Sequence, residues 1–260
     1  MGPAAMADLV RFEVDGPVAR LTLDSPHNRN ALSTALVEQL HAGFDRAAAH
    51  PGARVVVLGH TGGTFCAGAD LSEAAGREPS DLAVDRAREM TRLLRAILEL
   101  PLPVIGMVDG HVRAGGLGLV GACDVVVAGP GSTFALTEAR IGVAPSIISL
   151  TLLAKMTPRS AGRYFVTGER FGPQEAVAIG LVTVAAEDAQ AAVAALAAEI
   201  AKGSPQGLAT SKALTTASIL RDFDEHAEEL TEQSARLFVS DEAREGMLAF
   251  LQKRPPNWVG

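Results

Sequence analysis

The sequence predicts an α/β fold in which short buried strands alternate with helices through glycine-rich turns. Three β-branched runs, at 55–58, 104–108 and 125–128, are bounded mostly by Gly, Pro or polar residues, and such runs are typical of strands buried on both faces. The order of strand, glycine-rich turn and helix recurs along the chain, which favours a β/α architecture whose turns carry the functional site. From about Ser204 the composition changes to charged amphipathic helix.

The elements before residue 60 follow local signals. Alternating residues at 11–14 and 18–23, joined by a turn containing Gly16, predict an N-terminal hairpin. Ser33 then opens a helix with apolar residues at helical spacing, which ends at Pro51-Gly52.

The later elements are predicted in the same way. The strand at 104–108 leads to a glycine-rich turn and a short helix that ends near Ala122. Two amphipathic helices, at 223–238 and 241–252, close the chain. We therefore expect a core unit at 1–203 and a C-terminal helical unit at 204–260.

The composition excludes several classes of protein. The chain has 260 residues, of which 48% are hydrophobic but only 4% aromatic, so Ala, Val, Leu and Ile must build the core. Its 23 basic and 30 acidic residues give a net charge of −7, which argues against a broad surface for nucleic acid. A small anionic ligand bound locally remains compatible with this charge.

The cysteines and the apolar runs indicate in which cellular compartment the protein is expected. Cys66 and Cys123 are the only cysteines and have no neighbouring His in a metal-ligand spacing, so we expect two reduced thiols in a cytoplasmic protein, with no disulfide and no bound metal. No secretory signal opens the sequence and no run reaches the ~18 apolar residues of a membrane span. We expect no contact with a membrane.

Two glycine-bearing turns are candidates for chemistry: the stretch 65–71 after the strand at 55–58, and Gly115-Gly116 after the strand at 104–108. Small residues let a ligand approach the backbone closely, and N–H groups at a helix start have no intrahelical acceptor. Two such donors converging on one oxygen would form an oxyanion hole. Alternatively, each glycine serves tight backbone geometry alone.

The blocks 25–32, 65–71, 109–116 and 122–124 resemble, in order and spacing, the enoyl-CoA hydratase/isomerase (crotonase) superfamily. The resemblance covers residues from about 10 to 254. It implies a spiral of ββα units with a C-terminal helical region that mediates trimerisation, giving a homotrimer or a dimer of trimers. It also implies an acyl-CoA thioester substrate, with coenzyme A as part of that substrate and no metal or redox cofactor.

The resemblance assigns the central roles as follows. The backbone N–H groups of Ala69 and Gly115 would hold the oxygen of a thioester enolate, and Glu138 would transfer the proton. A second glutamate of the family's hydratases is replaced here by Gly118. The stretches 118–124, 138–149 and 162–171 look most like bacterial hydratases of the methylglutaconyl-CoA type.

We therefore expect hydration of a short or branched 2-enoyl-CoA. The alternatives are an enoyl-CoA isomerase that uses Glu138 alone and an acyl-CoA-binding protein without catalysis. Without the family, the pair Thr137-Glu138 would be an ordinary helix start with Thr137 as its N-cap.

The remaining candidate residues would bind coenzyme A or shape the acyl pocket. Phe250 and Lys253 are expected on one face of the final helix, covering coenzyme A of an adjacent subunit; a core Phe and a solvated Lys are the alternative. Asp70 is expected to fix its turn, and Arg113 to pair with a carboxylate or phosphate unless it is a solvated surface residue. Ile147, Ile148 and Leu152 are candidates for the pocket wall. The full set of candidate coenzyme A contacts is Arg29, Ala67, Gly68, Asp70, Leu71, Gly116, Arg113, Phe250 and Lys253.

Overall fold

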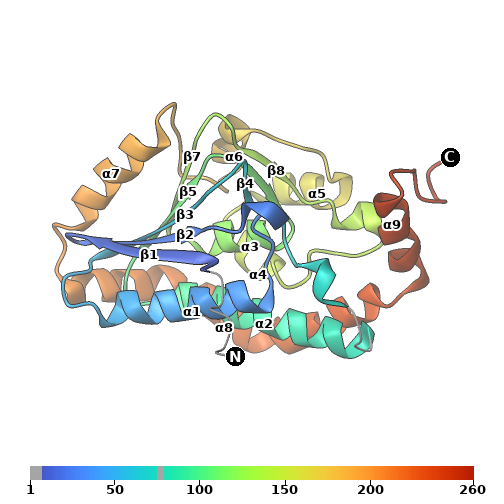
Figure 1. The fold of residues 1–260 in the computed structure, drawn as a ribbon, viewed down its shortest axis with the longest axis horizontal. Coiled ribbons are helices and arrows are strands. Elements are labelled where there is room, and N and C mark those ends of the chain that lie inside the picture. Colours follow the sequence, from blue (N-terminus) through green and yellow to red (C-terminus); the bar gives the residue numbers. More distant parts are fainter. Residues whose placement is uncertain (1–7, 75–78) are drawn as a thin grey trace, which may run out of the picture.

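The computed structural model describes residues 8–74 and 79–260, and its strands form two sheets (Figure 1). The large sheet contains β1 (Val10–Asp15), β2 (Val18–Leu23), β3 (Val55–His60), β5 (Val104–Val108), β7 (Val125–Ala128) and β9 (Val184–Ala185), in that order across the sheet. The small sheet contains β4 (Thr64–Cys66), β6 (His111–Arg113) and β8 (Thr133–Ala135). Strands β1 and β2 pair antiparallel, and the other named strand pairs are parallel.

The chain order builds a spiral of ββα units. The pairs β1 and β2, β3 and β4, and β5 and β6 are followed by α1 (Thr34–Ala49), α2 (Pro79–Glu99) and α3 (Gly115–Ala122) respectively. In the second and third units, the first strand joins the large sheet and the second joins the small sheet. The predicted α/β spiral is thus confirmed.

The helices lie on both faces of the large sheet. In Figure 1, α1 and α2 lie below it, and α7 (Ala189–Ile200) covers the opposite face. This second face is a small apolar layer in which Val57, Ile105 and Val127 pack near Val193. Strands β3, β5 and β7 are therefore covered from both sides, as their continuous apolar runs predict.

Local signals set the bounds of α1. The hydroxyl of Ser33 caps the helix by accepting a hydrogen bond from the Leu36 N–H (3.3 Å). The apolar residues Leu36, Leu40 and Phe44 are all buried. The helix begins and ends where the sequence predicts.

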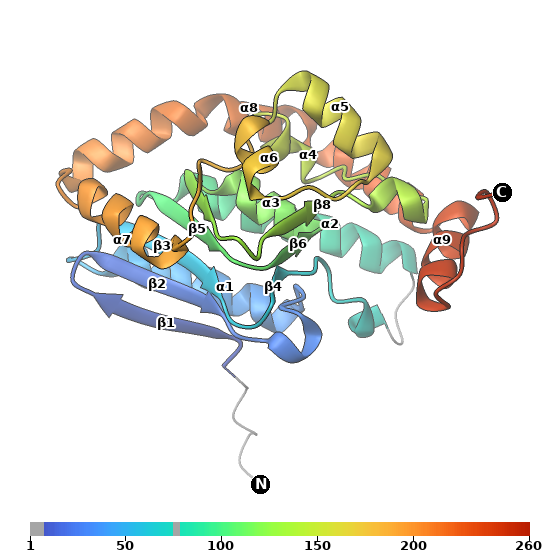
Figure 2. The same cartoon turned by 90° about the horizontal axis from the view of Figure 1, so that it is seen from above.

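The second half of the chain is mainly helical. It contains η3 (Glu138–Ile141), α4 (Ser149–Leu152), α5 (Pro158–Thr167), α6 (Pro173–Ala178), α8 (Pro205–Phe238) and α9 (Asp241–Leu251). Helix α8 runs alongside α2 (Figure 2). It is capped by Ser204, next to the predicted boundary, and its residues Ile219 and Phe223 belong to the main apolar core. The C-terminal helical region therefore shares that core.

Both glycine-bearing turns differ from the prediction in what precedes them. The stretch 65–71 overlaps the short strand β4 and does not follow β3 directly, and Gly115 follows the short strand β6. The two turns therefore come from adjacent strands of the small sheet, because β4 pairs with β6. Within 8–74 and 79–260, no helix is both long enough and apolar enough to cross a membrane.

Candidate active site

The backbone around Ala69 is set by a single bridge to Leu32. The N–H of Leu32 donates to the carbonyl of Gly68 (2.8 Å), and the N–H of Asp70 donates to the carbonyl of Leu32 (3.3 Å). Successive peptide groups of an extended segment point in alternate directions. The N–H of Ala69 therefore points away from Leu32, and it donates to no backbone acceptor in the described part of the chain.

The second backbone donor lies at the start of α3. Gly115 is the first residue of this helix, so its N–H has no intrahelical acceptor. Ala114 precedes it with φ +46° and ψ −123°, a conformation that residues other than glycine rarely adopt. This turn directs the chain from β6 into α3.

Glycine is required where the two turns meet. A Cβ on Gly68, whose φ is +94°, would lie 2.7 Å from the Ala114 Cβ and 3.3 Å from the Gly115 nitrogen. A Cβ on Gly116 would lie 2.7 Å from the carbonyl oxygen of Cys66. The two contacts of 2.7 Å are too short for a real Cβ, so these glycines let the Ala69 and Gly115 backbones approach one another.

Ala69, Gly115 and Glu138 line one cavity of about 180 Å³. Glu138 is the first residue of η3 and is only 8% exposed. Its Oε2 atom is buried and has no hydrogen-bond partner in the described part of the chain. Burial raises the pKa of Glu138 to about 7, against a smaller lowering by its own backbone N–H. The side chain of Thr137 makes no capping hydrogen bond, so capping does not account for this pair.

This arrangement can stabilise a carbonyl oxygen that gains negative charge and can exchange a proton beside it. Backbone donors fixed in advance stabilise a developing oxyanion, and a carboxyl group with a pKa near neutrality can both take and return a proton. The structure thus brings together the three residues predicted to be catalytic.

The position of Gly118 is closed rather than open. A Cβ there would lie 2.5 Å from the Cγ2 atom of Ile148, which therefore occupies the space of any side chain at 118. Among the described residues that line the cavity, Glu138 is the one carboxylate. Ile147 and Ile148 also line it, as predicted, whereas Leu152 is buried elsewhere.

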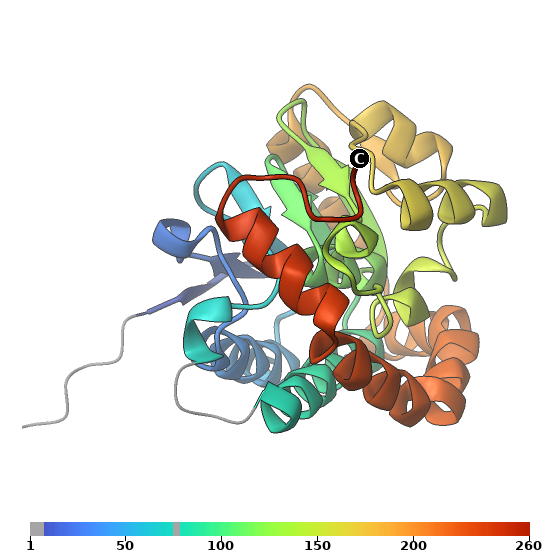
Figure 3. The ribbon, with the colours of Figure 1, turned by 90° about the vertical axis from the view of Figure 1, so that its right-hand side faces the viewer.

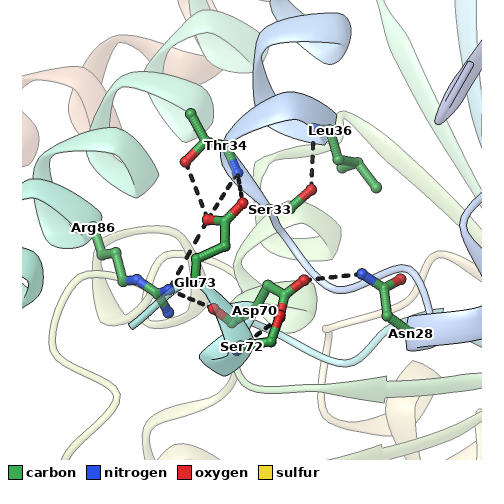
Figure 4. Close-up of polar contacts among 8 residues, drawn as sticks. All are labelled: Asn28, Ser33, Thr34, Leu36, Asp70, Ser72, Glu73 and Arg86. Atoms are coloured by element: carbon green, nitrogen blue, oxygen red, sulfur yellow. Dashed lines mark hydrogen bonds and ion pairs between the residues drawn. The ribbon is translucent and has the colours of Figure 1, made fainter. Parts of the chain in front are cut away.

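A polar network holds the segment that follows Ala69 (Figure 4). The Asp70 carboxylate accepts hydrogen bonds from Asn28 Nδ2 (3.0 Å), the Ser72 N–H (2.9 Å) and the Ser72 hydroxyl (2.7 Å). Burial by itself raises the pKa of Asp70, but these hydrogen bonds and the positive charge of Arg86 together hold this pKa below its usual value. Asp70 therefore fixes the turn, as predicted.

The other candidates near this turn lie as follows. Arg29 is exposed, has φ +59° and accepts a hydrogen bond from the Ala67 N–H through its carbonyl (3.1 Å). Leu71 begins η2 (Leu71–Ala74), and its side chain lies outside the described residues. Arg113 is half-buried and donates to the carbonyl (2.8 Å) and the hydroxyl (3.0 Å) of Thr133, so its guanidinium lies on β8 and not in the cavity wall. Their contacts with coenzyme A stay predictions.

Phe250 and Lys253 do not share a helix face, and that prediction is wrong. Helix α9 ends at Leu251, and Lys253 has φ +54°. The N–H of Arg254 donates to the carbonyl of Ala249, and the N–H of Lys253 donates to that of Phe250. This is a Schellman motif, which ends a helix at a left-handed residue. Phe250 is 66% exposed.

The sequence interpretation did not identify the part of the cavity wall that α2 and α8 contribute. Helix α2 contributes Ala83, Ala87 and Met90 at helical spacing, together with Arg86. The repeat of apolar residues at i, i+4 and i+7 is the signal that predicts one buried helix face. The α8 residues of the wall are Ser234 and Phe238.

Comparison with known proteins places this site in a family. The family model described as enoyl-CoA hydratase/isomerase matches residues 13–260. A crystal structure of an enoyl-CoA hydratase from Mycobacterium avium is similar at 65% identity with a TM-score of 0.93, covering 98% of this chain and all of that one (100%). One from Mycobacterium smegmatis is similar at 31% identity with a TM-score of 0.77, covering 97% of this chain and 99% of that one.

A curated relative agrees with these structures. An enoyl-CoA hydratase of Mycobacterium tuberculosis is 32% identical over 270 aligned positions, which cover 99% of this chain and 97% of the relative. The match of the family model over nearly the whole chain agrees with the spiral of ββα units and the paired glycine-bearing turns. The chain belongs to the enoyl-CoA hydratase/isomerase family.

Proposed function

We propose that the protein is an enoyl-CoA hydratase that adds water across the 2,3 double bond of a short or branched 2-enoyl-CoA. The observation that carries this proposal is the shared cavity, which is lined by the Ala69 and Gly115 backbones and by the Glu138 carboxyl group. The names of the relatives support the same reaction class.

In the proposed reaction, the thioester oxygen lies between the N–H groups of Ala69 and Gly115. Glu138 takes a proton from water while the water oxygen bonds to C3, and the electrons of the double bond move toward the thioester oxygen. The enolate then collapses as Glu138 returns the proton to C2, giving a 3-hydroxyacyl-CoA. Each oxyanion donor is worth about 3–4 kcal/mol in comparable sites. No metal or redox cofactor enters this scheme.

A second function is favoured by the single carboxylate. Because Ile148 fills the space beside Gly118, Glu138 is the one carboxyl group among the described cavity residues that could move protons. An isomerase needs no more than this, since one base can remove a proton from C2 of a 3-enoyl-CoA and return it to C4. An acyl-CoA-binding protein without turnover is the third possibility.

Product analysis separates these functions. The purified protein would be incubated with crotonyl-CoA, methylglutaconyl-CoA and a 3-enoyl-CoA. Hydration of either 2-enoyl substrate supports the proposal, double-bond migration alone supports the isomerase, and binding without turnover supports the third possibility.

The variant Glu138→Gln tests the role of the carboxyl group. We expect it to reduce kcat by about 10²–10⁴-fold, the usual loss for a general acid/base group, while acyl-CoA binding stays within about twofold. Unchanged turnover in Glu138→Gln would exclude this mechanism.

We also propose that the protein assembles as a homotrimer or a dimer of trimers through 204–260, and that it is cytoplasmic. Phe250, which is exposed in the single chain, would then cover coenzyme A bound to a neighbouring subunit. Sedimentation velocity of the purified protein checks the assembly, and a monomer at working concentration would contradict it.

A further inference from the structure

Arg86 places a positive charge in the wall of the candidate active site. It lies on α2, its side chain is 16% exposed, and it lines the same cavity as Ala69 and Glu138. Among the described residues of that wall it is the one cation, and most of its neighbours are apolar or small. A guanidinium in such surroundings is a strong site for an anionic oxygen.

Most N–H donors of the Arg86 guanidinium have no acceptor among the described residues. Within the described ranges, its hydrogen bond and ion pair involve only Nη2, which donates to the Asp70 carbonyl and lies 4.0 Å from Glu73 Oε2 (Figure 4). The N–H groups on Nε and Nη1 have no described acceptor. A bidentate pair with a carboxylate therefore remains available.

Glu73 does not neutralise Arg86 fully. Its carboxylate oxygens accept hydrogen bonds from the Thr34 N–H (3.1 and 3.2 Å) and from the Thr34 hydroxyl (3.1 Å), at the start of α1. The Glu73 carboxylate is thus bound to the start of α1, and it lies at the outer limit of ion-pair distance from Arg86. The Asp70 and Glu89 carboxylates also interact with the Arg86 charge, but neither has a hydrogen bond to its guanidinium among the described contacts, so Nε and Nη1 keep their capacity to bind a further carboxylate.

We propose that Arg86 determines specificity by binding a carboxylate at the far end of the acyl chain, so that the preferred substrates are CoA thioesters of dicarboxylic acids. The inference rests on the proposed acyl-CoA function and deepens it. In the proposed function, the thioester oxygen is held at Ala69 and Gly115. Met90 of α2 lies against Gly115. Arg86 lies one turn earlier on α2 and lines the same cavity. A carboxylate a few carbons from the thioester would reach the guanidinium.

The same guanidinium could instead meet a phosphate of coenzyme A, since both ligands offer anionic oxygens. The two sources differ in one consequence. A phosphate contact would strengthen every CoA ester equally, whereas a contact with the acyl carboxylate strengthens only the acidic esters. The ratio of two affinities therefore distinguishes them.

The test is calorimetric binding of two saturated esters that cannot be hydrated, glutaryl-CoA and butyryl-CoA, with free coenzyme A as reference. We expect the wild-type protein to bind glutaryl-CoA at least about tenfold more tightly, the difference that one charge-assisted pair produces. Arg86→Met should abolish or invert this preference, and Arg86→Lys should keep part of it.

Arg88→Met is the matched control. Arg88 lies on the same helix, is 51% exposed and pairs with Glu228 of α8 at 2.9 Å, outside the cavity wall. This variant should leave the preference unchanged. If Arg86→Met does not fold, the inference is still tested by the ratio of glutaryl-CoA to butyryl-CoA affinity in the wild type and in Arg86→Lys.

Two results would overturn the inference: a wild-type ratio near one, or an equal weakening of all three ligands in Arg86→Met. Hydration of crotonyl-CoA is measured alongside. Hydration with a ratio near one rejects this inference and leaves the proposed function standing. A tenfold ratio without hydration of crotonyl-CoA or methylglutaconyl-CoA rejects the hydratase and leaves the inference standing.

Discussion

Glu138 combines two properties that stability alone would select against. Its Oε2 atom is buried without a partner in the described structure, and its pKa is raised to about 7 by burial. A buried polar atom without a hydrogen bond costs about 1–3 kcal/mol. Such a cost is commonly found where a residue must exchange protons with a ligand.

The raised pKa predicts the pH dependence of activity. The proposed mechanism requires the ionised carboxylate in the free enzyme, so kcat/KM should rise about tenfold per pH unit below the pKa and level off above about 7. Steady-state rates with crotonyl-CoA between about pH 5 and about pH 9 check this. A midpoint near the ordinary value of 4.5 would contradict it.

The same group predicts a pH dependence of stability. Since the folded pKa of about 7 exceeds the ordinary value of 4.5, the folded state binds the additional proton between these values. The free energy of unfolding that Glu138 contributes is therefore full below about pH 4.5 and falls by about 3 kcal/mol as pH rises through 7. The free energy of unfolding, measured by urea denaturation at several pH values, should fall with pH over this range in the wild type but not in Glu138→Gln. The same pH dependence in both proteins would refute the assignment.

Ala114 stores backbone strain directly before Gly115, one of the two proposed oxyanion donors. Its φ of +46° costs an L-residue about 1–3 kcal/mol, whereas glycine adopts it freely but loses about 0.5–1 kcal/mol of chain entropy. The free energy of unfolding of Ala114→Gly should therefore lie within about 1 kcal/mol of the wild-type value. Ala114→Val, with a branched Cβ, should lose more than about 2 kcal/mol and most activity. Chemical denaturation measures the stability of the two variants, and kcat measures their activity. Equal stability of Ala114→Gly and Ala114→Val would contradict backbone strain at Ala114.

At the scale of elements, α9 rests directly on the segment that carries Glu138 (Figure 3). A Cβ on Gly142 would lie 2.6 Å from the backbone of Glu242, and a Cβ on Gly246 would lie 2.5 Å from that of Ile141. Backbone meets backbone here, so no side chain can move to make room. The position of α9 and that of η3 are thus coupled.

Gly246→Ala tests this coupling. The added methyl group must push α9 away from η3, so we expect a loss of about 1–3 kcal/mol, faster hydrogen exchange in 241–251 and a lower kcat. Gly162→Ala is the control, because nothing lies within 4 Å of a Cβ there and the site is in α5. That change should be neutral or stabilising. Unaltered exchange in α9 of Gly246→Ala would show that the elements are not coupled.

Elements with strong local signals could be predicted and those without could not. The Ser33 cap and the β-branched runs determine α1, β3, β5 and β7, because capping and apolar pattern act over a few residues. The strands β4, β6 and β8 have three residues each, too few to show a period. Ile148 fills the space beside Gly118 through a tertiary contact. Lys253 has the left-handed conformation that glycine usually adopts after a helix end. Neither leaves a local signal.

At the scale of the whole molecule, a buried ion pair between Lys212 and Asp124 joins the C-terminal helical region to the core. Lys212 Nζ of α8 lies 2.9 Å from Asp124 Oδ2 and donates to the carbonyls of Ile97 (2.7 Å) and Leu102 (3.0 Å). Asp124 also accepts from the Val104 N–H (2.8 Å). Desolvation lowers the pKa of Lys212, and Asp124 opposes this. The ammonium group thus connects α8 with α2, β5 and the start of β7.

Lys212→Met should lower the free energy of unfolding by about 3–5 kcal/mol, because it leaves the Asp124 carboxylate without its cation in the interior. Lys202→Met is the control, since the Lys202–Glu199 pair is 70% exposed on both sides and is worth under about 1 kcal/mol. Denaturant titration of both variants checks this. Equal effects of the two changes would mean that burial does not decide the outcome.

The strand order of the large sheet has a consequence for how the chain folds during its synthesis. The order β1-β2-β3-β5-β7-β9 increases steadily along the sequence, so each new strand adds to an edge that is already present and none must insert between two earlier ones. Only the β1–β2 hairpin forms by local contact, and parallel partners must wait for an intervening helix. The sheet can therefore grow in the direction of translation, with the N-terminal hairpin as its nucleus.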